Sequence, residues 1–224
     1  EIAQEVALPR STVQRIVAAL DSAQLVRSSG AGGLRLGPAL LKLISSVHSD
    51  VVDLVRPFLE QLSANVNETV TLARASGTQL AIIHYVVASR ELRVVPRIGL
   101  NLPLYSTSGG RVLLAMESDE DVRILVGDAY EDLTGMTVKT FPQLQELIAD
   151  VRANGLAIDL GETLEGVCTI AVALDTLLGR FSISLLVPAA RFHKHEAFYR
   201  KELMQCKEGI VNEIGRIKIG RAHV

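Results

Sequence analysis

The chain has 224 residues, of which 48% are hydrophobic and 21% charged, and its formal net charge is -2. This composition is typical of a soluble globular protein with one or two domains. There is no tryptophan and there are few other aromatic residues, so the core must be aliphatic. The near-neutral charge excludes a polycation that coats nucleic acid without specificity, although it leaves room for a small DNA-reading unit.

The cysteines and the apolar runs indicate the compartment. Cys168 and Cys206 are far apart and form no CxxC pair. We therefore expect neither a zinc site nor a disulfide framework. Such cysteine usage fits a protein of the reducing cytoplasm. No signal peptide is visible, and the longest apolar runs are too short to cross a bilayer, so we expect no membrane partner.

The N-terminal segment has the pattern of two helices joined by a turn. Residues 1–7 carry one short apolar stripe, and Pro9 then fits a turn or the first turn of a new helix. Residues 10–23 form an amphipathic pattern with spacing i, i+3, i+4 and i+7, given by Val13, Ile16, Val17 and Leu20. This order predicts a helix-turn-helix.

The polar face of the second helix suits base readout. A recognition helix presents the residues of its N-terminal end to base edges in the major groove. Glutamine can pair with adenine and arginine with guanine, and hydroxyl groups can reach phosphates or bases. The alternative is an ordinary solvent-exposed helix face. The candidate DNA-binding residues here are Arg10, Ser11, Thr12, Gln14 and Arg15.

A hairpin follows the two helices. Short alternating strands at 25–27 and 34–36 flank the glycine-rich segment 28–33, which is typical of the wing of a winged helix. Arg27 and Arg35 flank the loop and could contact phosphates or a minor groove. Three acids stand against four arginines in residues 1–36, so DNA attraction must come from placement of charge. We interpret residues 1–36 as a winged helix-turn-helix domain that starts inside its motif, with its first part missing.

A connector follows, with helical spacing of apolar residues from Leu40 to Leu62 and Pro57 as the only interruption. We predict a linker helix at about 38–49 and a second helix at about 51–66. The linker, residues 37–50, has little of its own domain to pack on. Its apolar stripe is therefore a candidate homodimer seam, and the alternative is docking on the larger domain.

The larger domain, residues 51–220, alternates strands and helices around a predicted antiparallel sheet, which makes it α+β. The predicted strands are at about 69–73, 80–87, 92–95, 169–174 and 181–187. The predicted helices are at about 108–116, 118–126, 140–154 and 193–215.

One candidate binding segment is the loop that leads into the helix at 108. Small and hydroxyl residues precede it, and the exposed N–H groups at the helix start, with Ser108 and Gly109, suit a carboxylate. Arg111 would add charge or point to solvent. The alternative is a capped helix with ordinary packing.

A second segment, residues 155–171, holds three acids beside a cysteine. An enzyme acting on a small carboxylate would use Cys168 as nucleophile, or Asp159 as a catalytic group. None of the five histidines lies in a recognisable nucleophile motif, so a buried, inert Cys168 is favoured. Further along, Ser182 and Ser184 alternate with apolar residues and share one strand face, which either lines a pocket or faces solvent.

We expect no metal and no cofactor. His193, His195 and Glu196 resemble a metal cluster, but at the start of a long helix without partner ligands they fit a solvated face better. The phosphate-binding GxxxxGK[ST] spacing is absent.

Taken together, the segments resemble the IclR family of transcription regulators over essentially the whole chain. The carrying stretches are EIAQEVALPRSTVQRIVAAL with LRLGPALLKL, IGLNLPLYSTSGGRVLLA, GLAIDLGETLEGVCTIAVAL, and Ser184–Pro188 before Arg191-Phe192. The resemblance implies a winged helix-turn-helix, a linker helix and a GAF-like effector-binding domain. It also implies homodimers or tetramers that bind double-stranded operator DNA and respond to a small organic acid.

The resemblance also implies a pocket, lined by Ser108 and Gly109, by Asp159, by the residue before the "IA" strand, and by serines within 182–186. The family often has cysteine directly before "IA"; here Thr169 stands there and Cys168 is one earlier. Adjacent strand residues face opposite ways, so Thr169 and Cys168 are alternatives for that place. The expected function is a regulator whose operator affinity is controlled by that acid.

Overall fold

The computed structural model describes residues 2–29, 33–97, 99, 101–176 and 178–216. The chain separates into two compact units, residues 1–51 and 52–224. Helix α3 (Ala39–Val66) contributes residues to both units. Each unit is described by itself below.

The N-terminal unit has the predicted order of a winged helix. Its elements are α1 (Ile2–Glu5), α2 (Arg10–Ser22), β1 (Val26–Ser29) and β2 (Gly33–Leu36). Pro9 stands at the N-cap of α2, where its missing N–H costs no helical hydrogen bond. In the antiparallel hairpin Arg27 lies opposite Arg35. The predicted wing loop lies partly in 30–32, outside the described residues.

The two helices predicted at 38–49 and 51–66 are one continuous helix, α3. The prediction of a break was wrong because no glycine or proline stands between the two segments. Pro57 lies inside α3 and lacks the N–H of a regular helical bond. Packing compensates, because Val55 and Leu59 on either side of it are fully buried.

The larger unit is built on a six-stranded antiparallel sheet with the strand order β5-β4-β3-β8-β7-β6. Its central pair, β3 with β8, joins strands that are far apart in sequence, whereas β7 and β8 are consecutive strands that form a hairpin. The strands are β3 (Thr69–Ser76), β4 (Gln79–Val86), β5 (Leu102–Pro103), β6 (Ala157–Leu160), β7 (Val167–Thr176) and β8 (Gly179–Pro188).

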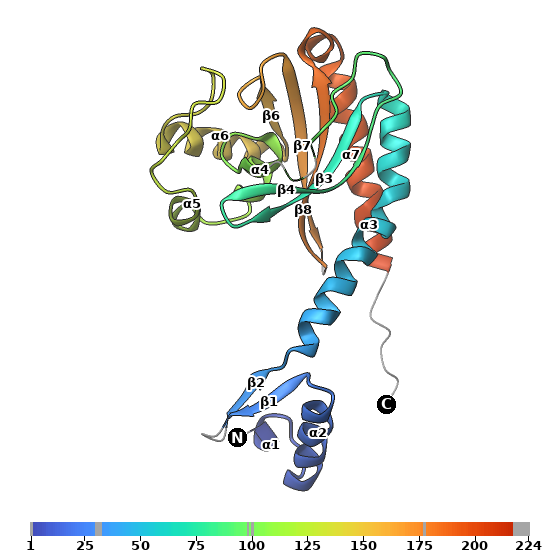
Figure 1. The fold of residues 1–224 in the computed structure, drawn as a ribbon, viewed down its shortest axis with the longest axis vertical. Helices are drawn as coiled ribbons and strands as arrows, with labels where there is room; N and C mark the ends of the chain where they lie inside the picture. Colours follow the sequence, from blue (N-terminus) through green and yellow to red (C-terminus); the bar gives the residue numbers. More distant parts are fainter. Residues whose placement is uncertain (1, 30–32, 98, 100, 177, 217–224) are drawn as a thin grey trace. The chain divides into compact units, whose positions relative to one another are not determined.

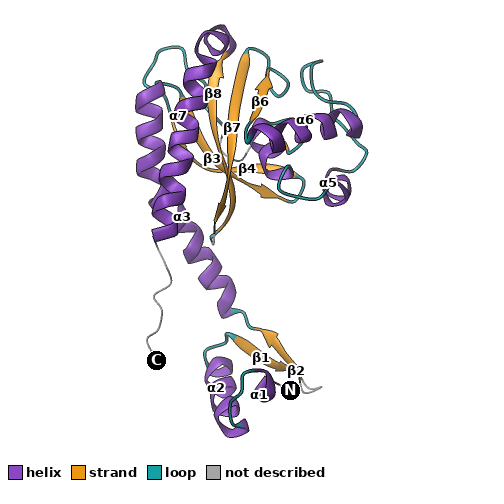
Figure 2. Ribbon diagram, turned by 180° about the vertical axis from the view of Figure 1, so that it is seen from behind, coloured by secondary structure: helices purple, strands orange, loops and turns teal. Residues whose placement is uncertain are grey.

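Helices cover both faces of this sheet (Figures 1 and 2). The C-terminal part of α3 and the long helix α7 (Ala189–Arg216) pack together on one face, where Gly209 lies against the Phe58 ring. The other face carries α4 (Ser108–Leu114), α5 (Asp119–Val126) and α6 (Phe141–Asn154). The α+β fold with an antiparallel sheet is therefore confirmed.

Side chains alternate between these two layers along β7 and β8. Ile183 and Leu185 are fully buried, while Ser182 and Ser184, which alternate with them along β8, face α4. The prediction that the two serines share a face is confirmed, and the face is buried against a helix. Small residues on this side allow α4 to lie close to the sheet.

One predicted strand is absent from the structure, and two short strands were not predicted. Residues 92–95, predicted as a strand, have no regular secondary structure. Instead the two-residue strand β5 pairs with β4 at the sheet edge. The short strand β6, which the sequence did not predict, pairs with β7 at the other edge.

Candidate functional site

A cavity of about 290 Å³ lies in the larger unit, between the sheet and the start of α4. Its floor is formed by residues that lie side by side on neighbouring strands. In one row Asp159 pairs with Thr169, and Thr169 with Leu186. In the next row Ser184 stands between Ala171 and Thr71. The sheet register thus brings together residues from four strands.

The cavity has a hydroxyl side and an apolar side. Ser108 and Thr169 share a hydrogen bond of 2.6 Å between their hydroxyl oxygens, which joins α4 to β7. The other hydroxyl residues in the lining are Thr71, Thr107, Thr163 and Ser184. The apolar lining comes from Leu80, Ile82, Val94, Val95, Pro96, Leu102, Leu164, Val167 and Leu186.

Asp159 is the acid of the cavity and is 1% exposed. Its Oδ1 accepts hydrogen bonds from the backbone N–H groups of Gly161 and Glu162, at 3.0 and 2.6 Å. Burial nevertheless raises the pKa of Asp159, because removal from water disfavours the charged form more than its partners favour it. A ligand that donates a hydrogen bond to this carboxylate is favoured over one that brings a second negative charge beside it.

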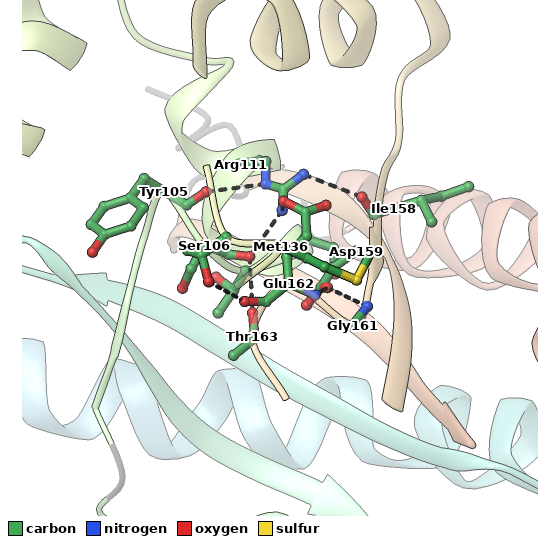
Figure 3. A network of polar contacts seen from close by, with 12 residues as sticks. Tyr105, Ser106, Arg111, Met136, Ile158, Asp159, Gly161, Glu162 and Thr163 are labelled. Atoms are coloured by element: carbon green, nitrogen blue, oxygen red, sulfur yellow. Dashed lines mark hydrogen bonds and ion pairs between the residues drawn. The ribbon is translucent and has the colours of Figure 1, made fainter. Parts of the chain in front are cut away.

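The Arg111 side chain lies among polar groups of Tyr105, Ile158 and the segment that follows β6 (Figure 3). Its side chain is 1% exposed, and its Nη2 donates to Glu162 Oε2 at 2.6 Å and to the carbonyl of Ser106 at 2.9 Å. It also donates to the carbonyls of Tyr105 and Ile158. The expectation of a solvent-facing Arg111 side chain was wrong. The guanidinium instead joins the loop before α4 to the loop after β6.

The start of α4 is capped from within the protein. The Thr107 hydroxyl accepts a hydrogen bond from the N–H of Gly110 at 2.9 Å. The N–H of Gly110 is therefore not available for a ligand carboxylate. This geometry supports the capped-helix alternative for that group, while Ser108 and Gly109 still line the cavity.

The glycines of α4 explain how the helix lies so close to the sheet. A Cβ on Gly109 would lie 3.0 Å from Ser182 Oγ, Ser184 Oγ and Leu80 Cδ2. A Cβ on Gly110 would collide with the backbone of Leu104. The pair of glycines therefore permits the close approach on which the cavity depends.

The structure brings most of the predicted effector residues together. Ser108, Gly109, Asp159, Thr169 and Ser184 line the cavity.

Two predicted effector residues lie elsewhere. Cys168 is buried on the face of β7 opposite to Thr169, and the Ser182 hydroxyl lies beneath Gly109 outside the lining. Ser182 Oγ is buried and has no hydrogen-bond partner among the described residues. Of the two alternatives before the "IA" strand, the one at the cavity is Thr169.

The sequence missed the residues that come from distant segments. Thr71 alternates with buried apolar residues on β3, a signal that could have identified it. Val94 and Val95 were assigned to a strand at about 92–95, and Pro96 and Arg97 to no element. No local pattern indicated that these residues reach the cavity.

The arrangement gives little support to nucleophilic catalysis by Cys168. Burial and the nearby Asp159 raise the pKa of the Cys168 thiol, which disfavours the reactive thiolate. No histidine stands in the lining among the described residues. In the same part of the chain, no group of three or more His, Cys, Asp or Glu side chains is placed to hold a metal ion.

A larger and more open cleft of about 540 Å³ lies next to β5, beside the rings of Tyr105 and Tyr130. Pro103 lines this cleft, whereas its neighbour Leu102 lines the cavity. None of the residues predicted from the sequence to bind an effector is in the cleft. Most of the predicted residues and the buried acid line the smaller cavity, so the smaller cavity is the candidate binding site.

In the N-terminal unit the candidate DNA-binding residues lie at the surface. Arg10, Ser11, Gln14 and Arg15 on α2 are exposed, and Thr12 is half-buried. Arg27 and Arg35 are exposed side by side on the hairpin. Among the described residues none of these four arginines takes part in an ion pair, in contrast to Arg111, Arg152, Arg180 and Arg191 of the larger unit.

None of the helices in the described ranges is both long enough and apolar enough to span a membrane.

Comparison with known proteins identifies the family. The model of the bacterial transcriptional regulator IclR C-terminal domain matches residues 44–212, about three quarters of the chain. The HTH-type transcriptional regulator TtgV of Pseudomonas putida (strain DOT-T1E) is 43% identical over 216 residues. This match covers 96% of the present chain and 83% of TtgV.

Solved structures of the same fold agree. The repressor BlcR of Agobacterium tumefaciens is 27% identical with a TM-score of 0.67, over 93% of this chain and 85% of BlcR. An IclR homolog from Microbacterium hydrocarbonoxydans, solved with 4-hydroxybenzoate, is 21% identical with a TM-score of 0.68, over 96% of this chain and 90% of that chain. The latter similarity shows the fold alone. The chain belongs to the IclR family of bacterial transcriptional regulators.

Proposed function

We propose that the chain binds operator DNA through its N-terminal unit, with an affinity controlled by a small organic acid in the cavity of the larger unit. The observation that carries the proposal is the cavity itself, which combines a buried acid and a row of hydroxyls with a large apolar lining. Residues 1–36 are assigned to DNA binding, 37–50 to the linker, and 51–220 to effector binding and oligomerisation. The expected assembly is a homodimer or a tetramer.

The lining supports one orientation of the acid. Arg97 is the basic residue of the described lining and is exposed. Arg111 is engaged by Glu162 and by carbonyls, so it offers no charge to a ligand. We therefore place the effector's carboxylate near Arg97, where it stays hydrated, and a hydroxyl of the effector toward Asp159. The apolar body would fill the remainder.

This orientation suits an acid with an apolar body and a hydroxyl group. The Microbacterium homolog was solved with 4-hydroxybenzoate, a molecule of this class. Because that protein shares only the fold, it supplies a probe and not the identity of the effector. The apolar lining of the present cavity supports the same class independently.

Control requires that the effector bind two states of the regulator unequally. A ligand with equal affinity for the DNA-competent and DNA-incompetent states shifts nothing. One charge-assisted hydrogen bond present in only one state is worth about 1.5–3 kcal/mol, which is about tenfold or more in operator affinity. A single differential contact at the cavity is thus sufficient.

For the DNA-reading surface we assign base contacts to Gln14 and Arg15, and phosphate contacts to Arg27 and Arg35. If Arg15 reads a base, Arg15→Ala weakens operator binding by about 1–3 kcal/mol and relaxes the preference at one position. Binding to a set of operator variants measures this. An equal loss on every DNA sequence would show that Arg15 contacts only phosphate.

The test of the proposal is a gel shift of the full chain on the DNA upstream of its own gene. We expect a sequence-specific shift whose midpoint moves with 4-hydroxybenzoate, moves less with benzoate, which lacks the hydroxyl, and less with phenol, which lacks the carboxylate. Absence of a specific shift would refute DNA regulation. A response to phenol equal to that of 4-hydroxybenzoate would refute the acid class.

A further inference from the structure

Residues 88–97 of the larger unit, which reach the cavity at 94–97, are here called the strap. The strap follows β4 and has no helix or strand of its own. Its last four residues, 94–97, all line the cavity. Within the described residues no backbone–backbone hydrogen bond fixes 89–97 to the sheet. The strap is therefore held in place mainly by side chains.

Thr69 contacts the strap at two places, Ala88 and Val94. It is fully buried at the start of β3, beside Leu186 of the cavity floor. Its hydroxyl donates to the carbonyl of Val94 at 2.6 Å and accepts from the N–H of Ala88 at 3.2 Å. One buried hydroxyl thus satisfies two backbone groups of a segment that the sheet does not pair.

Arg191 holds the middle of the strap from α7. Its Nη2 donates to the carbonyl of Leu92 at 2.9 Å. Two further hydrogen bonds, both of 2.8 Å, join its Nε and Nη2 to the carboxylate of Glu68. A bidentate pair of this kind fixes the plane of the guanidinium and therefore the direction of its contact with the strap.

Glu68 is completely buried and paired with Arg191. Arg90 of the strap lies 3.6 Å from its Oε1, and the Tyr199 hydroxyl donates to the same oxygen at 3.2 Å. Burial and Glu68 together raise the pKa of Tyr199 to about 12, so the phenol keeps its proton. A buried ion pair contributes little net stability, and a role in fixing geometry is the better explanation for this one.

We infer that Glu68, Thr69 and Arg191 form a clamp that holds the strap closed over the cavity, and that release of this clamp sets how fast the cavity exchanges its ligand. None of the three lines the cavity, so they are positioning residues. The consequence for ligand exchange rests on the proposed function, whereas the clamp itself does not. Elements from both faces of the sheet meet at this clamp: the strap lies on the cavity side and α7 on the other.

Limited trypsin digestion of the ligand-free chain tests the clamp. Arg93 and Arg97 are exposed in the strap, so cleavage after them requires only that the strap leave its site. Thr69→Val loses both neutral hydrogen bonds of the Thr69 hydroxyl and should raise the cleavage rate about fivefold or more. Arg191→Lys loses the bidentate pair and should raise the rate about tenfold or more.

Two controls separate strap opening from general destabilisation. Thr69→Ser keeps the hydroxyl and should restore the wild-type rate. Arg152→Lys makes the same chemical change on α6, where Arg152 also binds one carboxylate and backbone carbonyls, and should leave strap cleavage unchanged. Unchanged strap cleavage in Thr69→Val, or an equal rise at sites outside the strap, would overturn the clamp.

The second measurement uses 4-hydroxybenzoate as the probe in stopped-flow binding. If the clamp gates the cavity, Thr69→Val should release the probe faster by the factor seen in proteolysis. Faster proteolysis with an unchanged release rate would overturn the gating role. Failure of the probe to bind the wild-type chain would count against the acid effector alone, because proteolysis still decides on the clamp.

Discussion

Asp159 is buried, and its carboxylate accepts hydrogen bonds from the backbone. Its Oδ1 accepts from two consecutive backbone N–H groups, which holds the loop after β6 in a tight turn. Burial still raises the pKa of its carboxyl above the ordinary 3.8. The folded chain therefore keeps a proton on Asp159 to a higher pH than the unfolded chain does.

This shift predicts a pH-dependent stability. A raised pKa of an acid contributes stability below the ordinary pKa, and that contribution is lost as pH rises through the folded value. Asp159→Asn retains an oxygen that can accept from Gly161 and Glu162 but does not titrate. The free energy of unfolding of the wild type relative to Asp159→Asn should fall as pH rises above 3.8. Urea unfolding between about pH 3 and pH 7 measures it, and parallel curves would contradict the expectation.

Arg111 is the buried cation of the same region. Replacement by methionine leaves Glu162 without its ion-pair partner and several carbonyls without a donor. We expect Arg111→Met to lower the free energy of unfolding by about 3–5 kcal/mol. A second change, Glu162→Met, should recover part of the loss, because the unpaired acid is then removed. Equal instability of the single and double variants would show that the ion pair is not the cause.

At the scale of elements, the fit of α4 on the sheet rests on its two glycines. Gly110 faces the backbone of Leu104, which cannot move away, whereas Gly109 faces the ends of side chains. We predict that Gly110→Ala destabilises the fold by about 1–3 kcal/mol or more, and Gly109→Ala by less. Urea unfolding of both variants checks the order. The reverse order would place the tight contact at the sheet and not at Leu104.

The longer helices and strands could be predicted from the spacing of their apolar residues, whereas the short strands β5 and β6 could not. The strap shows where this reasoning fails. Leu92, Val94 and Val95 have the composition of a strand, but Thr69 and Arg191 take the backbone bonds that a neighbouring strand would have made. The spacing of apolar residues does not indicate that side chains from other segments will take these backbone hydrogen bonds.

The candidate site was predictable in part. Ser108, Asp159, Thr169 and Ser184 follow from the family resemblance, and the sheet register brings them together. The burial of the Arg111 side chain was not predictable. Helical spacing indicates on which face of the helix a residue lies, but it does not indicate which loop covers that face. The buried Arg111 has partners in a distant segment, the Glu162 carboxylate and the Ile158 carbonyl, besides the nearby carbonyls of Tyr105 and Ser106.

At the scale of the whole molecule, the two units differ in where their charged residues lie. The smaller unit carries exposed arginines on α2 and on the hairpin, while the larger one carries the buried acid and the cavity. Helix α3 belongs to both units as one continuous helix. Under the proposed function, an effector that favours one state of the larger unit biases operator binding by linkage alone.

The most direct test of this account fills the cavity. Leu186 is half-buried on the cavity floor, and Leu186→Trp would occupy the space and add the only tryptophan of the chain as a fluorescent reporter. The measurement is the operator Kd of wild type and variant with and without 4-hydroxybenzoate. We predict equal operator affinity without the acid, a shift of about tenfold or more with it in the wild type, and no shift in Leu186→Trp. An undiminished response in Leu186→Trp would contradict control through this cavity.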